Sequence, residues 1–197
     1  MKKHIKNMFN LQFLSLSSVF VLPLVALHSL PAPAQAALIQ GANAPDFTLQ
    51  GALDGKPVTF SLKATLSKGL VVLYFFPAAF TPGCTQEAHA FADAAKQIEA
   101  EGATLVGVTA GNTDRVTEFS KTECRGKFAV LADPGTFTAI LYHSVNAQNH
   151  ALLSERTSYV ISPDGKILLS YTGSDPEQHV TRTLEFLKKW NASKTQK

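Results

Sequence analysis

The sequence predicts an α/β fold in which helices flank a central mixed sheet. Three apolar runs of strand length, at 71–76, 104–109 and 128–131, alternate with segments of helical periodicity. This alternation is typical of parallel strands that are buried on both faces. Later in the chain, segments 157–161 and 166–171 flank Pro163-Asp164-Gly165, which predicts an antiparallel hairpin. A parallel centre joined to such a hairpin gives a mixed sheet.

Elements at the two ends complete the predicted fold. Segments 46–49 and 57–62 read as short strands around the turn Asp54-Gly55. A last helix is expected to begin near Asp175-Pro176, because proline is favoured in the first helical turn. Its inward face carries Val180, Leu184 and Leu187. A parallel core, a hairpin and a closing helix in this order predict a thioredoxin-like fold.

The first 36 residues have the organisation of a secretory signal peptide. Three lysines precede a mostly apolar run over 13–27, and Ala34-Gln35-Ala36 supplies the small-x-small pattern that signal peptidases cleave. A membrane anchor is the alternative, but Pro23 and several serines interrupt the run. We therefore expect cleavage at about Ala36/Ala37. One domain, residues 37–197, would then work in an exported compartment, which we expect to be the periplasm.

The excess of basic residues comes from this leader. The whole chain has 18 Lys and Arg against 15 Asp and Glu, and residues 1–36 hold three lysines and no acid. Fifteen of each remain in the domain, so its charge indicates neither a nucleic-acid partner nor membrane association after cleavage. The spacing of His143, His150 and His179 is unlike that of metal ligands. We expect no metal and no cofactor.

Cys84 is placed by its neighbours in the first turn of a helix. Thr81 suits the N-cap and Pro82 the first helical position, so Cys84 would be the third helical residue. An apolar stripe continues from it through Ala88, Phe91, Ala95 and Ile98. First-turn N–H groups lack helical acceptors and the helix dipole is positive there, so this position stabilises a thiolate. The alternative is a small buried cysteine without chemistry.

The segment around Cys84 resembles a known family. Pro77-x-x-x-Thr81-x-x-Cys84 matches the P-x-x-x-T-x-x-C motif of peroxiredoxins. The string 81–85, with Glu87-Ala88, resembles the bacterioferritin-comigratory, or peroxiredoxin Q-like, branch of the AhpC/TSA family. Arg156, just before the predicted strand at 157–161, matches the active-site arginine of that branch. The resemblance covers most of residues 40–190 and implies a thiol-dependent peroxidase that reduces hydrogen peroxide or organic hydroperoxides, with Cys84 as the peroxidatic residue.

The resemblance also implies roles for four neighbours of Cys84. Arg156 would hold the thiolate and polarise the peroxide with its charged, planar guanidinium, or else form a surface salt bridge. Thr81 would cap the N–H of residue 84 or turn its hydroxyl to the substrate. Pro77 would shield the thiol from water, or merely end a strand. Glu87 would orient an arginine, or be an acid favoured near a helix N-terminus.

Cys124, the second cysteine, is the candidate resolving residue. A helix is predicted from Thr113-Asp114 to Cys124, with Gly126 as its C-cap, and some peroxiredoxins carry a resolving cysteine there. Attack on the Cys84 sulfenic acid would form an intramolecular disulfide. The alternatives are an inert cysteine, with an external thiol resolving, and a permanent structural bridge. Many peroxiredoxin Q-like members instead place the resolving cysteine five residues after the first, where this chain has His89, which we predict to be solvated.

Three other functions are the alternatives for a chain with the same fold. A thioredoxin-like disulfide oxidoreductase needs C-x-x-C, but 85–87 after Cys84 contains no cysteine. A copper carrier needs a second cysteine where this chain has Ala88. A non-catalytic redox sensor or holdase would use the same reactive thiol. For the peroxidase, the resemblance implies a peroxide substrate, a thioredoxin-like or other dithiol reductant, and a monomer or weak homodimer.

Overall fold

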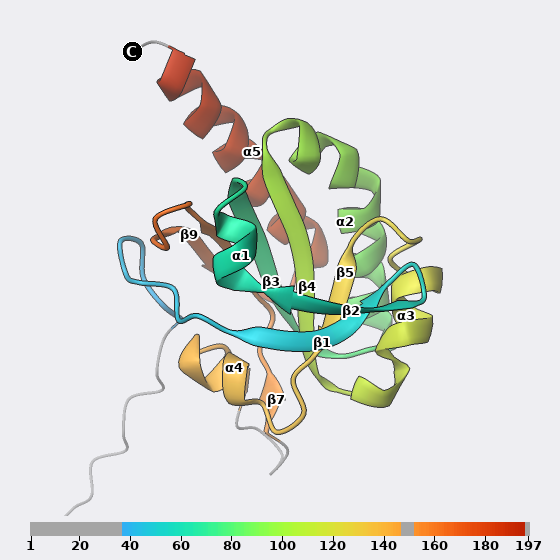
Figure 1. Ribbon diagram of the computed structural model, residues 1–197. Coiled ribbons are helices and arrows are strands. Elements are labelled where there is room, and N and C mark those ends of the chain that lie inside the picture. The colour runs from blue at the N-terminus through green and yellow to red at the C-terminus, as the bar shows by residue number, and fades with distance from the viewer. Residues whose placement is uncertain (1–36, 147–151, 196–197) are drawn as a thin grey trace, which may run out of the picture. The chain divides into compact units, whose positions relative to one another are not determined.

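A seven-stranded mixed sheet lies at the centre of the computed structural model, which describes residues 37–146 and 152–195 (Figure 1). The strand order is β2-β1-β5-β4-β3-β8-β9, and β6 pairs with β7 in a separate small sheet. The strands are β1 (Thr48–Leu53), β2 (Lys56–Ser61), β3 (Leu70–Ala78), β4 (Ala103–Gly111), β5 (Ala129–Ala132), β6 (Val145–Asn146), β7 (Leu153–Ser154), β8 (Thr157–Ile161) and β9 (Ile167–Thr172). The predicted signal peptide, residues 1–36, lies outside the described residues.

The central strand β3 is buried on both faces, as its apolar run predicts. It runs parallel to β4, with Leu70 opposite Ala103, and antiparallel to β8. Its side chains alternate between two core clusters. Val72, Tyr74 and Phe76 enter one cluster, and Val71, Leu73 and Phe75 enter the other. The parallel pairs β3–β4 and β4–β5 and the antiparallel hairpin β8–β9 confirm the predicted mixed sheet.

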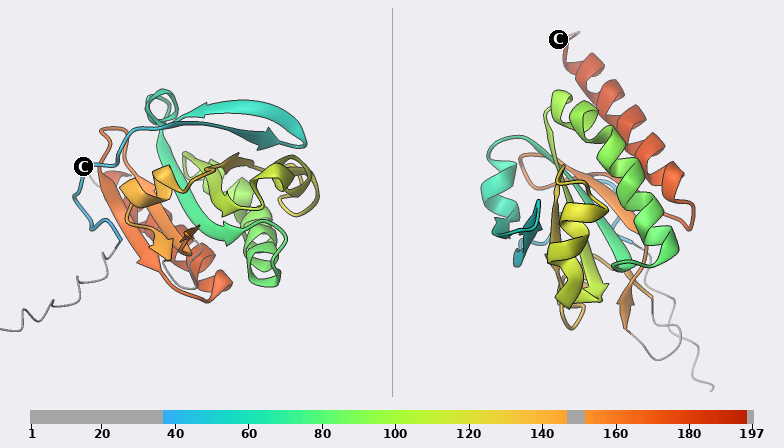
Figure 2. Two further views of the ribbon diagram at one scale, coloured as in Figure 1. Left: turned by 90° about the horizontal axis from the view of Figure 1, so that it is seen from below. Right: turned by 90° about the vertical axis from the view of Figure 1, so that its right-hand side faces the viewer.

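Helices cover both faces of the sheet. The long helices α2 (Pro82–Ala100) and α5 (Pro176–Thr195) pack side by side on one face, as the right-hand view of Figure 2 shows. The 3₁₀ turn η1 (Thr113–Arg115) leads into α3 (Val116–Thr122), which packs into the core cluster that contains Tyr74. On the other face lie α1 (Leu62–Leu66) and α4 (Phe137–Leu141). No helix in the described ranges combines the length and apolar character that a membrane span needs.

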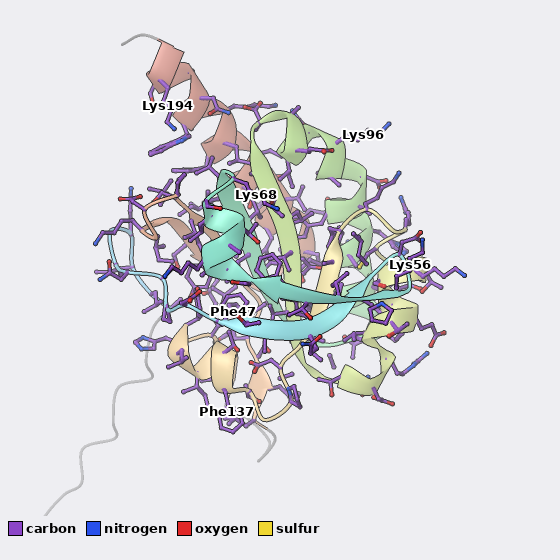
Figure 3. All side chains as sticks on the ribbon, in the orientation of Figure 1. Phe47, Lys56, Lys68, Lys96, Phe137 and Lys194 are labelled. Carbon is purple, nitrogen blue, oxygen red and sulfur yellow. The ribbon has the colours of Figure 1, made fainter. Side chains whose placement is uncertain are left out.

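The first predicted strand pair is correct in kind but shifted along the chain. Leu62 begins α1 instead of ending a strand, because the Ser61 side chain accepts the Ala64 N–H and caps that helix. Asp46 precedes β1 and accepts the Lys63 N–H with its carboxylate. Phe47 is buried just before β1 (Figure 3). Neither α1 nor α4 was expected from the sequence, since each is a short helix of five residues between strands.

Candidate active site

Cys84 occupies the helix start that the sequence predicts. After β3 the chain turns at Phe80, whose backbone is left-handed with φ of 65°. An aromatic residue rarely adopts this conformation, and here its ring packs edge-on against Phe119 at 5.1 Å. Thr81 follows as an extended N-cap and Pro82 begins α2. Cys84 is therefore the third helical residue, and only 1% of its surface is exposed.

The first turn of α2 leaves N–H groups without helical acceptors. The Thr85 N–H donates to the Thr81 carbonyl at 2.9 Å, so the amides of Gly83 and Cys84 precede the first helical hydrogen bond. Thr81 is the N-cap residue, as predicted, but its side chain makes no capping hydrogen bond, so the first of the two roles allowed for its hydroxyl is wrong. The tight turn before the helix aims the threonine hydroxyl back at Ala78, where it donates to the carbonyl at 3.1 Å.

Arg156 contacts both the Cys84 sulfur and Glu87. Arg156 lies immediately before β8, and its Nη2 donates to Cys84 Sγ at 3.6 Å. Its Nη1 forms an ion pair with Glu87 Oε2. Glu87 is fully buried, so the ion pair is not the surface salt bridge that was the alternative role for Arg156. Sequence reasoning missed Gly83: a Cβ there would lie 3.1 Å from Arg156 Nη2, so glycine makes room for the guanidinium.

Burial and charge oppose each other in this pair. Burial raises the pKa of Glu87, whereas the Arg156 charge and hydrogen bond lower it and favour the ionised carboxylate of the ion pair. Burial alone would lower the pKa of Arg156, but Glu87 and Cys84 outweigh it and the pKa is raised. The guanidinium is therefore a fixed cation beside the sulfur.

Pro77 and Thr81 flank the site at the point where β3 leads into α2. Pro77 is the next-to-last residue of β3, and its carbonyl accepts from the Thr109 hydroxyl at 3.3 Å. Because β8 pairs with β3 only as far as Phe75, the proline removes no hydrogen bond from that ladder. Neither residue hydrogen-bonds the Cys84 sulfur, and their predicted roles toward thiol and substrate stay predictions.

Cys124 is a free, fully buried thiol two residues beyond α3. Burial, followed by the nearby Glu123 carboxylate, raises the pKa of this thiol. The next residues, Arg125 and Gly126, both have left-handed backbones, and the Gly126 N–H donates to the Ser120 carbonyl at 3.0 Å. The helix thus ends slightly earlier than predicted, with the expected glycine turn after it. Cys84 is likewise free, so the structure contains no permanent bridge between the two cysteines.

Two ion pairs tie the chain around Cys124 to α2. His89 Nε2 lies 2.8 Å from Glu123 Oε2, and Arg125 pairs with Asp93. His89 is thus only partly solvated, with 40% of its side chain exposed. The Arg125–Asp93 pair is largely exposed to solvent, so it holds this segment weakly, whereas the Glu123 side chain is mostly buried.

A buried histidine completes the polar surroundings of Glu87. His179 Nδ1 accepts from the Ser158 hydroxyl at 2.8 Å, and Nε2 donates to the Gly173 carbonyl at 3.0 Å. Burial lowers the pKa of His179 to about 4, so the ring is neutral near pH 7. Sequence reasoning considered His179 only as a metal ligand. His179 lies on the inward face of α5, four residues before the buried Thr183. This helical spacing was the signal in the sequence that the ring is buried.

The burial of His179 predicts a contribution to stability that is lost in acid. An ordinary histidine takes up a proton near pH 6.5, whereas His179 in the folded chain does so near pH 4. Between these values the unfolded state binds more protons. The contribution of His179 to the free energy of unfolding therefore falls by on the order of 3 kcal/mol as the pH falls from 6.5 to 4. Denaturant titrations at pH 7 and pH 4 should show a smaller loss for His179→Gln than for wild type. Equal losses would contradict this assignment.

Comparisons with known proteins identify the family of this chain. The sequence matches the AhpC/TSA family over residues 40–170. A chloroplastic peroxiredoxin Q from Sedum lineare is 33% identical over 154 residues, covering 77% of this chain and 79% of the relative. Another, from Populus jackii, is 36% identical over 149 residues, covering 75% and 67%. The crystal structure of peroxidoxin BcpB from Mycobacterium tuberculosis is 30% identical and superposes with a TM-score of 0.68 over 76% of this chain and 96% of that one. This chain belongs to the AhpC/TSA family, in its peroxiredoxin Q-like branch, and is a thiol-dependent peroxidase.

Proposed function

We propose that Cys84 is the peroxidatic residue, that Arg156 activates it, and that Cys124 resolves the oxidised form. One observation carries the proposal: a buried sulfur in the first turn of α2 receives a hydrogen bond from a guanidinium that is itself held by Glu87. The substrates are hydrogen peroxide and organic hydroperoxides, and a thioredoxin-like dithiol returns the enzyme to its reduced form.

The first step is attack of the Cys84 thiolate on one peroxide oxygen. A sulfur–oxygen bond forms, the O–O bond breaks, and the leaving oxygen takes up a proton to give water or an alcohol. The sulfur becomes a sulfenic acid. The first-turn amides and Arg156 offer donors where negative charge moves from sulfur to the leaving oxygen. The guanidinium has five N–H groups, of which the sulfur and Glu87 use only some, so others remain for the peroxide.

The second step forms a disulfide between Cys84 and Cys124. The Cys124 sulfur attacks the sulfenic sulfur and displaces its oxygen as water. Both thiols are buried, and a disulfide requires Cα atoms within about 7 Å of each other. We propose that the first turn of α2 unwinds and that the segment after α3 loosens. One exposed and one partly exposed ion pair and a glycine turn hold that segment, so local opening costs less than global unfolding.

Replacement of Cys84 tests the nucleophile. Cys84→Ser should reduce peroxide turnover to below about 1% of wild type, because a serine hydroxyl is not ionised near neutral pH. Far-ultraviolet circular dichroism should stay unchanged, since the two side chains are similar in size. Turnover would be followed as peroxide consumption with excess dithiol. A variant that keeps most of the activity would remove Cys84 from the mechanism.

Replacement of Arg156 tests the activating cation. Arg156→Lys keeps the charge but cannot contact the sulfur and Glu87 together through a planar fork. The second-order rate of Cys84 oxidation should fall on the order of tenfold or more. Stopped-flow fluorescence of Trp190 or competition with a reference peroxidase would measure it. An unchanged rate constant would show that Arg156 only supports the fold.

Replacement of Cys124 tests the resolving step. After one equivalent of peroxide, the intact mass of wild type should decrease by two hydrogens, and that of Cys124→Ser should increase by one oxygen. The variant should also over-oxidise with further peroxide, since its sulfenic acid persists. If wild type gains oxygen and never forms the disulfide, Cys124 is not the resolving residue and the enzyme works with one cysteine.

We further propose that residues 1–36 direct export and are removed, and that the mature domain works in the periplasm as a monomer or weak homodimer. The order of lysines, apolar run and small-residue site supports this proposal. Expression of the full chain in a Gram-negative host should yield periplasmic protein whose N-terminal residue is at or near Ala37. A cytoplasmic product that retains Met1 would contradict it. Light scattering of the mature protein would report its assembly.

A further inference from the structure

Glu87 has one carboxylate oxygen that the Arg156 contact does not use. Oε2 pairs with Arg156, whereas Oε1 is buried without a hydrogen-bond partner among the described residues. An unpaired carboxylate oxygen in a protein interior is costly, and water would normally solvate it. His179 lies beside this oxygen, with Nδ1 3.8 Å from Oε1.

The imidazole of His179 is held in one orientation from two sides. Its Nε2 donates to the Gly173 carbonyl, so in the neutral ring Nδ1 carries the lone pair and accepts from the Ser158 hydroxyl. The ring is fully buried and stands against Tyr171 at 4.7 Å between centroids. A fixed, neutral ring therefore closes the far side of Glu87 and keeps solvent from its free oxygen.

The same histidine is linked to Arg156 by a second route. The Gly173 carbonyl accepts from His179, and the Gly173 N–H donates to the Arg156 carbonyl at 3.3 Å. The charged and titratable groups around the ring are Glu87 from α2, Arg156 before β8, Tyr171 from β9, and Asp175 and Arg182 beside and on α5. Among them Glu87 is the one whose free atom faces Nδ1.

We propose that His179 is a positioning residue for the peroxidase reaction, acting through Glu87 to hold the Arg156 guanidinium against the Cys84 sulfur. With the neutral imidazole in place, Arg156 is the charged partner of the carboxylate among the described residues. If the ring is lost, water can bind the Glu87 carboxylate or the carboxylate can rotate away from Arg156. The guanidinium then no longer has one fixed position. This inference rests on the proposed function of Cys84 and Arg156.

Two substitutions separate positioning from simple packing. His179→Leu fills the space but leaves Ser158, Gly173 and Glu87 Oε1 without the imidazole. It should slow oxidation of Cys84 by about tenfold or more, because small displacements of reacting groups have large kinetic effects. His179→Gln can accept from Ser158 and donate to Gly173, so it should recover to within about threefold of wild type. Reduction of the oxidised enzyme by dithiol should change by less than about twofold in both, since that step does not use Arg156.

Leu187→Ala is the matched control. Leu187 is fully buried on the same face of α5, two turns further along. Its truncation should lower the thermal midpoint while leaving the oxidation rate at 25 °C within about twofold of wild type. A general loss of stability would instead slow both variants together.

A double-mutant cycle with Glu87→Gln tests the route. If His179 acts through the carboxylate, Glu87→Gln/His179→Leu should be no more than about twofold slower than Glu87→Gln alone. The inference is overturned if His179→Leu keeps a wild-type oxidation rate, or if it slows the Glu87→Gln enzyme as much as it slows wild type. If His179→Leu does not fold, Ser158→Ala carries the same cycle, because it removes the donor that orients Nδ1. Failure of the proposed function would look different, since wild type and Cys84→Ser would then consume peroxide equally.

Discussion

The hydrogen bond from Arg156 to the Cys84 sulfur joins two segments that lie 72 residues apart. It exists because β3 and β8 are neighbours in the sheet. The chain leaves β3 toward α2 at the end where the chain enters β8. The helix start brings the sulfur to this edge, and the residue before β8 brings the guanidinium. The rest of the sheet and the two long helices keep these ends in register.

Burial keeps water from screening this contact, but it also removes the solvation of the charged groups. A guanidinium and a carboxylate in a protein interior lose the solvation they have in water, and only close pairing offsets that loss. Glu87 pairs with Arg156 through one carboxylate oxygen, and its other oxygen lies beside the neutral ring of His179. The raised pKa of Glu87 and the lowered pKa of His179 have the same cause, which is the removal of water from this corner. A polar cluster of this kind favours one arrangement of its side chains over alternative ones.

The sequence predicted the parts of the fold that follow local rules. Apolar runs located β3 and β4, Thr81-Pro82 located the start of α2, and Asp175-Pro176 located the start of α5. Short elements such as α4 were not predicted, because a single turn of helix carries little periodicity. The Thr81 hydroxyl was misjudged because its partner depends on how the preceding turn closes, which no propensity encodes.

The site was predictable where a motif is contiguous and unpredictable where tertiary contacts decide. Cys84 and Arg156 could be placed from their neighbours in the sequence. The partnership of Glu87 with His179 could not, because it depends on how α2 and α5 pack, and the two residues lie 92 positions apart in the chain. A histidine on an apolar stripe does not by itself indicate one role. The same limit applies to His89, whose partner Glu123 lies on another element.

The central claim is that the buried first-turn thiol, and not the second cysteine, meets the peroxide. The most direct measurement treats reduced wild type and Cys124→Ser with one equivalent of hydrogen peroxide in the presence of dimedone, which traps sulfenic acids. Proteolysis and mass spectrometry then locate the adduct. The account predicts that the adduct forms on the peptide containing Cys84, and that it accumulates most in the variant that cannot close a disulfide. An adduct on the Cys124 peptide of wild type, or none on Cys84 in either protein while peroxide is consumed, would contradict it.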